Sequence, residues 1–352
     1  MRKKETRDLF SKKNISLYLL IFLILTSFSS CGNIDKTEKT KDIFAMDTYI
    51  NLKAYGPDAG SAIEEASERI YNIERTLSVT EEESDVSKIN IAKGKPVNVS
   101  RDTVNILETA RRINEESGGA LSVTIYPVLC AWGFTTGSNQ IPDKDLLSEL
   151  LKRCDDSKIY IDNNSITIPS GAMIDLGAIT KGYTGDAVID IMRKHNIGSA
   201  IINLGGNVQA HGRKPDGSMW TVGIRDPFSP DELLGTVSVS DSAVITSGNY
   251  ERYFIGNDGK RYWHILDPKD GYPADNGLVS VTVIGKNGAE CDALSTALFV
   301  EGTQKAVQHW SSSGGFEMIC VTKDGNLLIT EGIADNYTPK NNMPLTVIHR
   351  DK

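Results

Sequence analysis

Asp292 and Thr296 form the pair of side chains whose types and spacing most directly suggest chemistry. They lie four residues apart in AECDALSTALFV, residues 289–300, a small and apolar stretch that predicts a buried helix. Positions i and i+4 share one face of a helix, so the carboxylate and the hydroxyl would point the same way. Such hard oxygen ligands suit Mg²⁺ or Ca²⁺. The pair alone leaves an ordinary helix cap and a local threonine bond as open alternatives.

A strand–glycine–helix junction is the second candidate. In MIDLGAITKGYTGDA, residues 173–187, Asp175 ends an apolar run, and Gly177 and Gly182 reduce bulk where the chain turns into a helix. Backbone amides at such a junction can hold phosphate, and Lys181 could add positive charge. The spacing is neither that of a P-loop nor that of a complete GxGxxG fingerprint. An ordinary glycine-rich start of a helix is the more common explanation of such a stretch.

A histidine in a strand is the third candidate. In YWHILDPKDGYP, residues 262–273, His264 lies within an otherwise apolar run that ends at Asp267-Pro268. A lone histidine in a strand is usually a satisfied core residue, but imidazole titrates near neutrality and can carry a proton. In INLGGNVQAHG, residues 202–212, Gly205-Gly206 lies between two strand-like runs, and VITSGNYERYF, residues 244–254, is one more candidate stretch. A plain turn explains the glycine pair equally well.

The elements that must position these residues alternate between two periodicities. Apolar spacing predicts helices over 58–77, 102–117, 143–153, 179–195 and 290–312. Strands are predicted over 46–54, 199–204, 207–212, 219–224, 234–240, 251–256, 261–266, 278–284, 316–322 and 326–330, with a hairpin over 159–168. Tight turns such as Asn257-Asp258-Gly259 and Lys323-Asp324-Gly325 join many of the strands. We therefore expect an α+β fold of two fused lobes, with antiparallel sheets and segregated helices.

The N-terminus is similar to a bacterial lipoprotein signal over residues 1–30. A basic start precedes an apolar run, residues 15–28, that is short for a membrane span. Ser29-Ser30 then precede Cys31, so we expect cleavage before Cys31 and a lipid on its thiol. An ordinary cleaved signal and an uncleaved anchor are the alternatives. The polar residues 31–42 predict a tether between membrane and domain.

Composition excludes several classes of protein. Cleavage of the signal would remove six basic and two acidic residues, which takes the net charge from −8 to −12. Such an acidic chain without basic clusters is a poor candidate for binding nucleic acid. The sequence has no GxSxG, HExxH or CxxC pattern, so serine hydrolase, zinc protease and thiol redox activities lack support. Cysteines 130, 154, 291 and 320 fit no metal framework, and whether two of them pair stays open.

Taken together and in this order, the motifs resemble the ApbE family, the FAD:protein FMN transferases formerly described as thiamine-biosynthesis lipoproteins. The resemblance covers about 43–335, which we take as the transferase domain, followed by a C-terminal tail over 336–352. It is carried by Met46-Asp47-Thr48, Asp175-Leu176-Gly177 with Lys181-Gly182-Tyr183, Asn203-Leu204-Gly205-Gly206-Asn207, Thr246-Ser247-Gly248 with Glu251-Arg252, His264-Ile265-Leu266-Asp267-Pro268 with Gly271-Tyr272-Pro273, and Asp292-Ala293-Leu294-Ser295-Thr296-Ala297.

The resemblance implies a site for each substrate group. Asp292 and Thr296 would hold Mg²⁺, with the backbone oxygen of Ala178 as the third protein ligand. FAD would lie across the junction of the lobes, in contact with Met46, Ala120, Leu121, Ser122, Asp175, Lys181, His264 and Ile265. Three positions depart from the family pattern: Ser122, where Asp is frequent, Thr80, where an aromatic residue is frequent, and Asp270, where Thr is usual.

The resemblance also implies the reaction. The enzyme would transfer the FMN moiety of FAD to a threonine hydroxyl of another protein through a phosphoester bond and release AMP, with His264 and Asp292 as the catalytic residues. The acceptors would be redox proteins of the membrane or cell surface that carry a flavinylation motif. Lipid on Cys31 would hold the enzyme at the extracytoplasmic face of the cell membrane. A Mg²⁺-dependent FAD pyrophosphatase and a non-catalytic FAD-binding lipoprotein are the alternatives.

Overall fold

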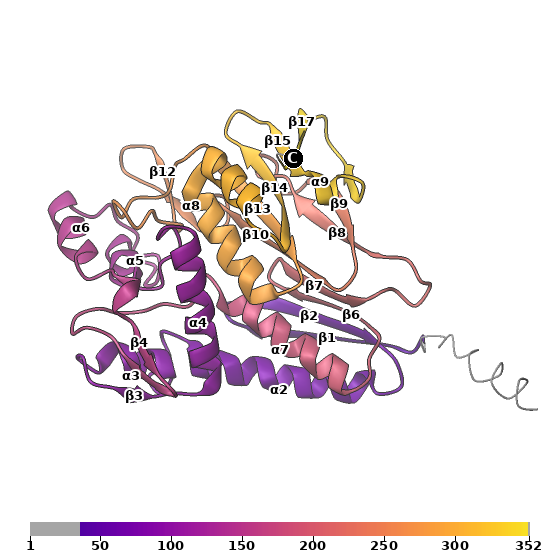
Figure 1. Ribbon diagram of the computed structural model, residues 1–352, viewed down its shortest axis with the longest axis horizontal. Coiled ribbons are helices and arrows are strands. Elements are labelled where there is room, and N and C mark those ends of the chain that lie inside the picture. The colour runs from indigo at the N-terminus through magenta and orange to yellow at the C-terminus, as the bar shows by residue number, and fades with distance from the viewer. Residues whose placement is uncertain (1–35, 351–352) are drawn as a thin grey trace, which may run out of the picture. The chain divides into compact units, whose positions relative to one another are not determined.

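A nine-stranded sheet is the central element of the computed structural model, which describes residues 36–350 (Figure 1). Its strand order is β1-β2-β6-β7-β10-β13-β14-β15-β17, and every neighbouring pair is antiparallel except β15 with β17. The predicted antiparallel α+β fold is therefore confirmed. The strands are β1 (Glu38–Ala45), β2 (Thr48–Tyr55), β6 (Ser199–Leu204), β7 (Asn207–Gly212), β10 (Ser242–Gly248), β13 (Leu278–Gly285), β14 (Phe316–Thr322), β15 (Leu327–Thr330) and β17 (Leu345–Ile348).

Helices cover one face of this sheet. Figure 1 shows α7 (Thr180–Lys194) and α8 (Gly288–Ser312) lying against it, with α2 (Ala59–Leu77) and α4 (Arg101–Glu116) beside them. The predicted helices correspond to these elements and to α6 (Lys144–Leu151). Ile63 and Ile70 of α2 pack with Met192 of α7 on Leu52 and Ile202 of the sheet. Each such buried aliphatic side chain contributes roughly 1.5–3 kcal/mol, which holds the helices in a fixed position over the strands.

A second, three-stranded sheet covers part of the opposite face. Its order is β16-β9-β8, with β8 (Trp220–Arg225), β9 (Leu233–Val239) and β16 (Tyr337–Pro339). Trp220 and Val237 of this sheet pack with Val244 of β10 and Ile319 of β14. The two sheets and the helix layer thus enclose separate cores on the two faces of the central sheet. From Lys36 onward the chain forms one compact unit.

The predicted C-terminal tail is wrong. Residues 336–352 include β16, whose Tyr337 is buried and donates its hydroxyl to the carbonyl oxygen of Leu234 at 3.0 Å. They also include β17, which pairs in parallel with β15. The segment was missed because β17 lies at the sheet edge and its apolar residues are half exposed, so the period-two signal of a buried face is weak.

The predicted tether over 31–42 is wrong from Glu38 onward. Those residues belong to β1, which pairs with β2 from Glu38 to Ala45. The strand is polar because it is the edge of the sheet, and charged side chains are typical of edge strands. Glu38 accepts a hydrogen bond from the Tyr55 hydroxyl at 2.6 Å across the pair. The predicted signal over 1–30 and the lipidated Cys31 lie outside the described residues.

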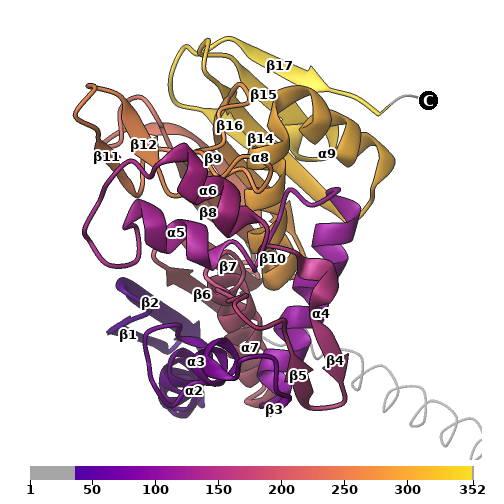
Figure 2. The same ribbon diagram turned by 90° about the vertical axis from the view of Figure 1, so that its left-hand side faces the viewer.

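The remaining elements are short, and the largest group of them packs around Trp132. Trp132 of α5 (Tyr126–Trp132) packs against Phe254 of β11 (Tyr253–Ile255) and Tyr262 of β12 (Arg261–Trp263). Figure 2 shows β11 and β12 beside α5 and α6. The predicted turn at Asn257-Asp258-Gly259 joins β11 to β12 as expected. Smaller elements are α3 (Asp85–Ile91), β3 (Val97–Asn98), β4 (Tyr160–Asp162), β5 (Ser165–Thr167), α9 (Glu331–Ala334) and a 3₁₀ turn, η1 (Asp156–Lys158).

No helix within residues 36–350 combines the length and the apolar character needed to cross a bilayer.

Candidate active site

The N-termini of α7 and α8 meet at Asp292. This side chain is 5% exposed. One carboxylate oxygen accepts the backbone N–H of Gly182 at 2.8 Å, and the other accepts the side-chain amide of Asn207 at 3.0 Å. Burial raises the pKa of Asp292, which Lys181 and the two hydrogen bonds only partly oppose. Among residues 36–350 Asp292 makes no ion pair, so a buried carboxylate lacks a direct counter-charge here.

Glycines let the two helix ends approach this closely. A methyl group at Gly182 would overlap the carbonyl oxygen of Gly288 and would lie 2.7 Å from Cβ of Asp292. A methyl group at Gly288 would lie 2.6 Å from the carbonyl oxygen of Gly182. The glycine-rich junction is therefore required by packing between α7 and α8, and not only by the start of a helix.

Asp186 was not predicted as a site residue. Its carboxylate accepts the backbone N–H groups of Gly288 at 2.7 Å and Ala289 at 2.9 Å, the first amides of α8. Burial raises the pKa of Asp186 to about 6. Its position four residues after Gly182, on the same helix face, was the one signal that sequence reasoning could have used.

Thr296 lies one turn beyond Asp292 and faces β10. Its hydroxyl is 3.3 Å from the Ser247 hydroxyl, which also lies 2.8 Å from the hydroxyl of Ser295. The predicted third donor, the backbone of Ala178, lies in the turn just before α7. Within the described residues no group of three His, Cys, Asp or Glu side chains could hold a metal ion. The predicted donor set differs from such a group, because it contains only one of these side chains, the Asp292 carboxylate, with one hydroxyl and one backbone carbonyl.

His264 follows β12 directly, where the predicted strand over 261–266 ends early. Its backbone N–H donates to the carbonyl oxygen of Arg252 at 3.1 Å, and Nδ1 lies 3.2 Å from the same oxygen. Because a carbonyl only accepts, this contact assigns the proton to Nδ1 and leaves Nε2 as an acceptor. Burial, with the charges of Arg252 and Lys181, lowers the pKa of His264 to about 4. The imidazole is therefore neutral at neutral pH.

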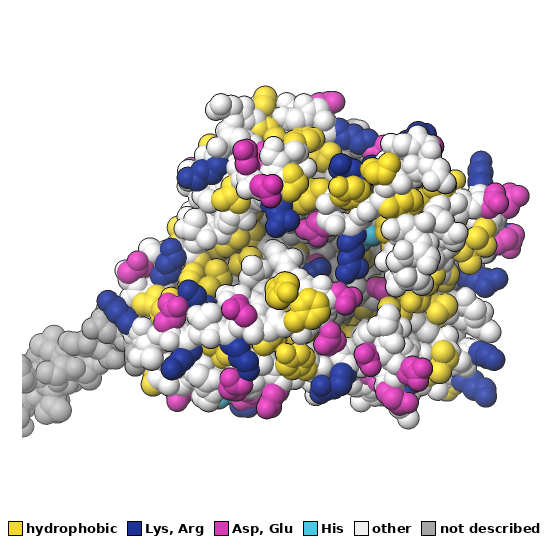
Figure 3. All heavy atoms as spheres, turned by 180° about the vertical axis from the view of Figure 1, so that it is seen from behind, with side chains coloured by type: hydrophobic (Ala, Val, Ile, Leu, Met, Phe, Trp, Pro, Cys, Tyr) yellow, Lys and Arg dark blue, Asp and Glu magenta, His cyan; other side chains and the backbone are white. Residues whose placement is uncertain are grey.

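Positive charge gathers around these residues. The charge of Lys181 acts on Asp292, His264 and Glu251, and that of Arg252 acts on His264 and Asp175. Neither cation forms an ion pair with any described residue. Burial raises the pKa of Asp175. Figure 3 shows a hollow in one face of the molecule where Lys or Arg, Asp or Glu, and a histidine side chain come together.

The other predicted flavin contacts lie in two groups. Met46 occupies a tight turn with positive φ, and its N–H donates to Glu74 at 2.5 Å. The Thr184 hydroxyl of α7 lies 3.7 Å from the Met46 sulfur, which places this turn beside α7. Ile265 is buried, immediately after His264.

The predicted segment 120–122 is largely internal. Ala120 and Leu121 are 8% and 1% exposed, so their side chains belong to the core. The Ser122 hydroxyl donates to Asp156 at 2.6 Å. The carbonyl oxygen of Val123 accepts the N–H of Asp175 at 2.8 Å, so this segment borders the junction before α7.

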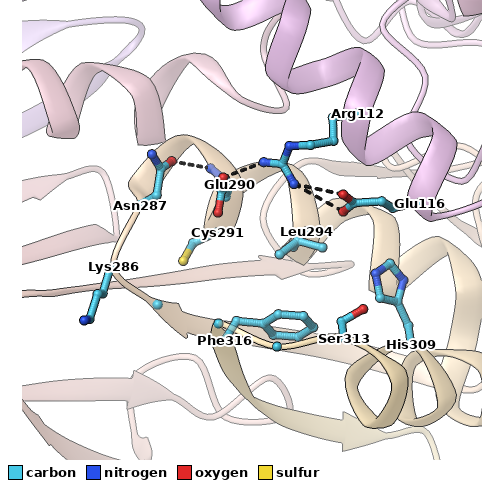
Figure 4. A pocket seen from close by; sticks show the side chains of 13 residues that line it. Arg112, Glu116, Lys286, Asn287, Glu290, Cys291, Leu294, His309, Ser313 and Phe316 are labelled. Atoms are coloured by element: carbon cyan, nitrogen blue, oxygen red, sulfur yellow. Dashed lines mark hydrogen bonds and ion pairs between the residues drawn. The ribbon is translucent and has the colours of Figure 1, made fainter.

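A separate polar pocket lies against α4 and α8 (Figure 4). Arg112 of α4 pairs there with Glu290 at 2.5 Å and with Glu116 at 3.1 Å. None of the predicted site residues lines it, so it is distinct from the site around Asp292.

The architecture defines an α+β protein in which a buried carboxylate lies where the N-termini of α7 and α8 meet, close enough to Lys181 for that charge to act on it. Residues 46–320 match the model of the ApbE family. The chain belongs to this family, as its motifs predict.

Relatives cover most of the chain. It is 34% identical to the FAD:protein FMN transferase of Klebsiella pneumoniae (strain 342) over 84% of this chain and 92% of that protein. It is 31% identical to that of Treponema pallidum (strain Nichols) over 90% and 93%. Among solved structures, the ApbE protein of Thermotoga maritima superposes with a TM-score of 0.79 at 31% identity, covering 84% of this chain and 98% of that one. The flavin transferase ApbE from Vibrio cholerae gives 0.74 at 25% identity, covering 86% and 96%.

Proposed function

We propose that this protein transfers the FMN moiety of FAD to a threonine hydroxyl of an acceptor protein and releases AMP. The observation that carries the proposal is the buried Asp292 carboxylate, which lies where the N-termini of α7 and α8 meet and within reach of the charge of Lys181. Its relatives from Klebsiella pneumoniae and Treponema pallidum bear the name of this activity.

Asp292, Thr296 and the backbone oxygen of Ala178 would hold Mg²⁺. The donors are all hard oxygens, which Mg²⁺ prefers. The carboxylate has a raised pKa and accepts hydrogen bonds only from neutral groups, so a cation there would supply the missing charge. When bound, the ion supplies Lewis-acid neutralisation of the diphosphate, worth several kcal/mol of the barrier.

The chain's own residues position the reacting groups and move the proton. Nε2 of His264 accepts the proton of the threonine hydroxyl, because Nδ1 is engaged with the Arg252 carbonyl. The hydroxyl oxygen forms a bond to the phosphorus on the FMN side, and the bond from that phosphorus to the oxygen of AMP breaks. Lys181 and Arg252 oppose the negative charge of the phosphoryl oxygens, which is the main protein contribution to phosphoryl transfer.

A transfer assay tests this function directly. Purified full-length protein is incubated with FAD, Mg²⁺ and a redox protein that carries a flavinylation-motif threonine. We expect a mass gain of one FMN on that threonine, equimolar AMP, and complete loss of the reaction when a chelator removes the metal. An acceptor of the same sequence with threonine replaced by valine is the matched control. Free FMN in place of labelled acceptor would indicate a pyrophosphatase, and unchanged FAD would indicate a binding protein.

The acceptors we propose are redox proteins of the membrane or cell surface, since lipid on Cys31 would hold the enzyme outside the cytoplasmic membrane. We expect Cys31→Ser to move the protein from the membrane fraction to the soluble extracytoplasmic fraction without changing its activity on soluble acceptor. Immunoblots of both fractions measure this. A variant that stays in the membrane fraction contradicts the anchor.

A further inference from the structure

The helices α7 and α8 cap each other. Asp292 of α8 accepts the N–H of Gly182 in the first turn of α7, and Asp186 of α7 accepts the first two N–H groups of α8. The first N–H groups of a helix have no partner within it, and a carboxylate there also opposes the helix dipole favourably. Two reciprocal caps therefore link the two helices in both directions.

A third link closes the arrangement. The side-chain amide of Gln209, from β7, donates to the carbonyl oxygen of Gly182 at 2.9 Å. The same amide lies so close to Gly288 that any side chain at 288 would overlap it. Because Asp186 holds two consecutive amides at 2.7 and 2.9 Å, it restricts both the separation and the rotation of α8 relative to α7.

This restriction matters because the proposed metal donors come from both sides of the contact. Asp292 and Thr296 belong to α8, whereas Ala178 lies just before α7. The three proposed donors could share one ion only if the two helix ends kept one relative position. Without Asp186, the reciprocal cap would depend on Asp292 alone, the residue that must also serve the ion.

We infer that Asp186 is a positioning residue for the metal site: through the first amides of α8 it sets Asp292 and Thr296 against the turn before α7. This inference rests on the proposed function. Asp186 has no hydrogen bond with either of the two side-chain donors; its carboxylate is held by the first amides of α8 and by the side chain of Gln209.

The test is calorimetric titration of Mg²⁺ into full-length protein saturated with FAD, in the absence of acceptor. Asp186→Asn keeps one acceptor oxygen but turns an amide N–H toward a backbone N–H. We expect its Mg²⁺ dissociation constant to rise about tenfold, as is common when a residue behind a metal ligand is changed. Saturating Mg²⁺ should restore kcat, which a merely unfolded fraction would not do. Asp190→Asn is the matched control, because Asp190 is exposed one turn further along α7 and pairs with Arg193.

Asp292→Ala separates failure of this inference from failure of the proposed function. If Asp292→Ala binds Mg²⁺ as the unchanged protein does, the proposed metal site is wrong. If it loses Mg²⁺ while folded Asp186→Asn binds normally, the positioning role is wrong. Should Asp186→Asn not fold, Gln209→Leu keeps both carboxylates but removes the hydrogen bond to the Gly182 carbonyl and the hydrogen bond of Gln209 with Asp186. A rise of about threefold in the Mg²⁺ dissociation constant of this variant supports the inference that the contact between α7 and α8 positions the metal donors. An unchanged constant overturns that inference.

Discussion

Asp292→Ala will abolish FMN transfer and leave a folded protein. The substitution removes the one carboxylate of the proposed donor set, and the loss of several kcal/mol of charge stabilisation lowers the rate on the order of 10³-fold or more. The fold survives because the change also removes a buried carboxylate whose pKa burial has raised. The amide groups of Gly182 and Asn207 lose their acceptor, which costs roughly 1–3 kcal/mol each and lowers Tm by several degrees. Mass spectrometry of the acceptor and thermal unfolding measure the two effects.

Two further variants test how much each proposed metal ligand contributes to transfer. Asp292→Asn keeps the size of the side chain and one acceptor oxygen, so transfer should be lost with a smaller change in Tm. Thr296→Val removes a neutral ligand only, so we expect a smaller loss of transfer, which excess Mg²⁺ partly restores. Transfer by Asp292→Ala that persists in the presence of a chelator would contradict the metal role. So would a larger loss in Thr296→Val than in Asp292→Asn.

The sequence was most informative where a segment buries one face. The helix predicted over 58–77 from apolar periodicity corresponds closely to α2. Asp292 and Thr296 lie on one helix, α8, as their spacing predicts. It was least informative at sheet edges. β1 and β17 have few buried side chains, so neither shows the alternation that marks a half-buried strand. The central strand β10 was also missed, because three consecutive buried residues, Ala243 to Ile245, replace strict alternation there.

The sequence likewise predicts some features of the candidate site and not others. Local spacing predicts a carboxylate and a hydroxyl on one face, but the groups that orient them come from far along the chain. Gly288 and Asp186 are 102 residues apart, and Asn207 and Asp292 are 85 apart. No local pattern encodes such contacts, because they depend on how α7, α8 and β7 pack around the two glycines that permit their approach.

The structure shows a side-chain partner for Ser122, one of the residues that depart from the family pattern. Ser122 stands where the family often has aspartate, and its hydroxyl donates to Asp156, which comes from η1. Asp156 also accepts the N–H of Val123 at 2.8 Å. A carboxylate therefore lies beside position 122 although the residue there is serine.

His264→Ala will reduce transfer by roughly 10²–10⁴-fold at neutral pH, the usual contribution of a positioned general base. The pH dependence is the sharper test. Burial lowers the pKa of His264 to about 4, so the neutral, proton-accepting form predominates above about pH 5. From this group alone kcat/KM should be level between pH 6 and 8 and should fall as the pH drops through 4. An ordinary histidine, with a pKa near 6.5, would already lose activity between pH 7 and 6.

Arg252 provides the decisive comparison, because its charge is one of the causes that lower the pKa of His264. Arg252→Gln keeps the backbone carbonyl that holds Nδ1 but removes the charge, so the acid limb of the kcat/KM profile should move to higher pH. His264→Ala should lack that limb altogether. His349→Ala, an exposed histidine paired with Glu331, serves as the control and should keep the unchanged profile. If His264→Ala keeps an acid limb at the same pH, the group that titrates there is not His264. The proton transfer would then belong to another residue.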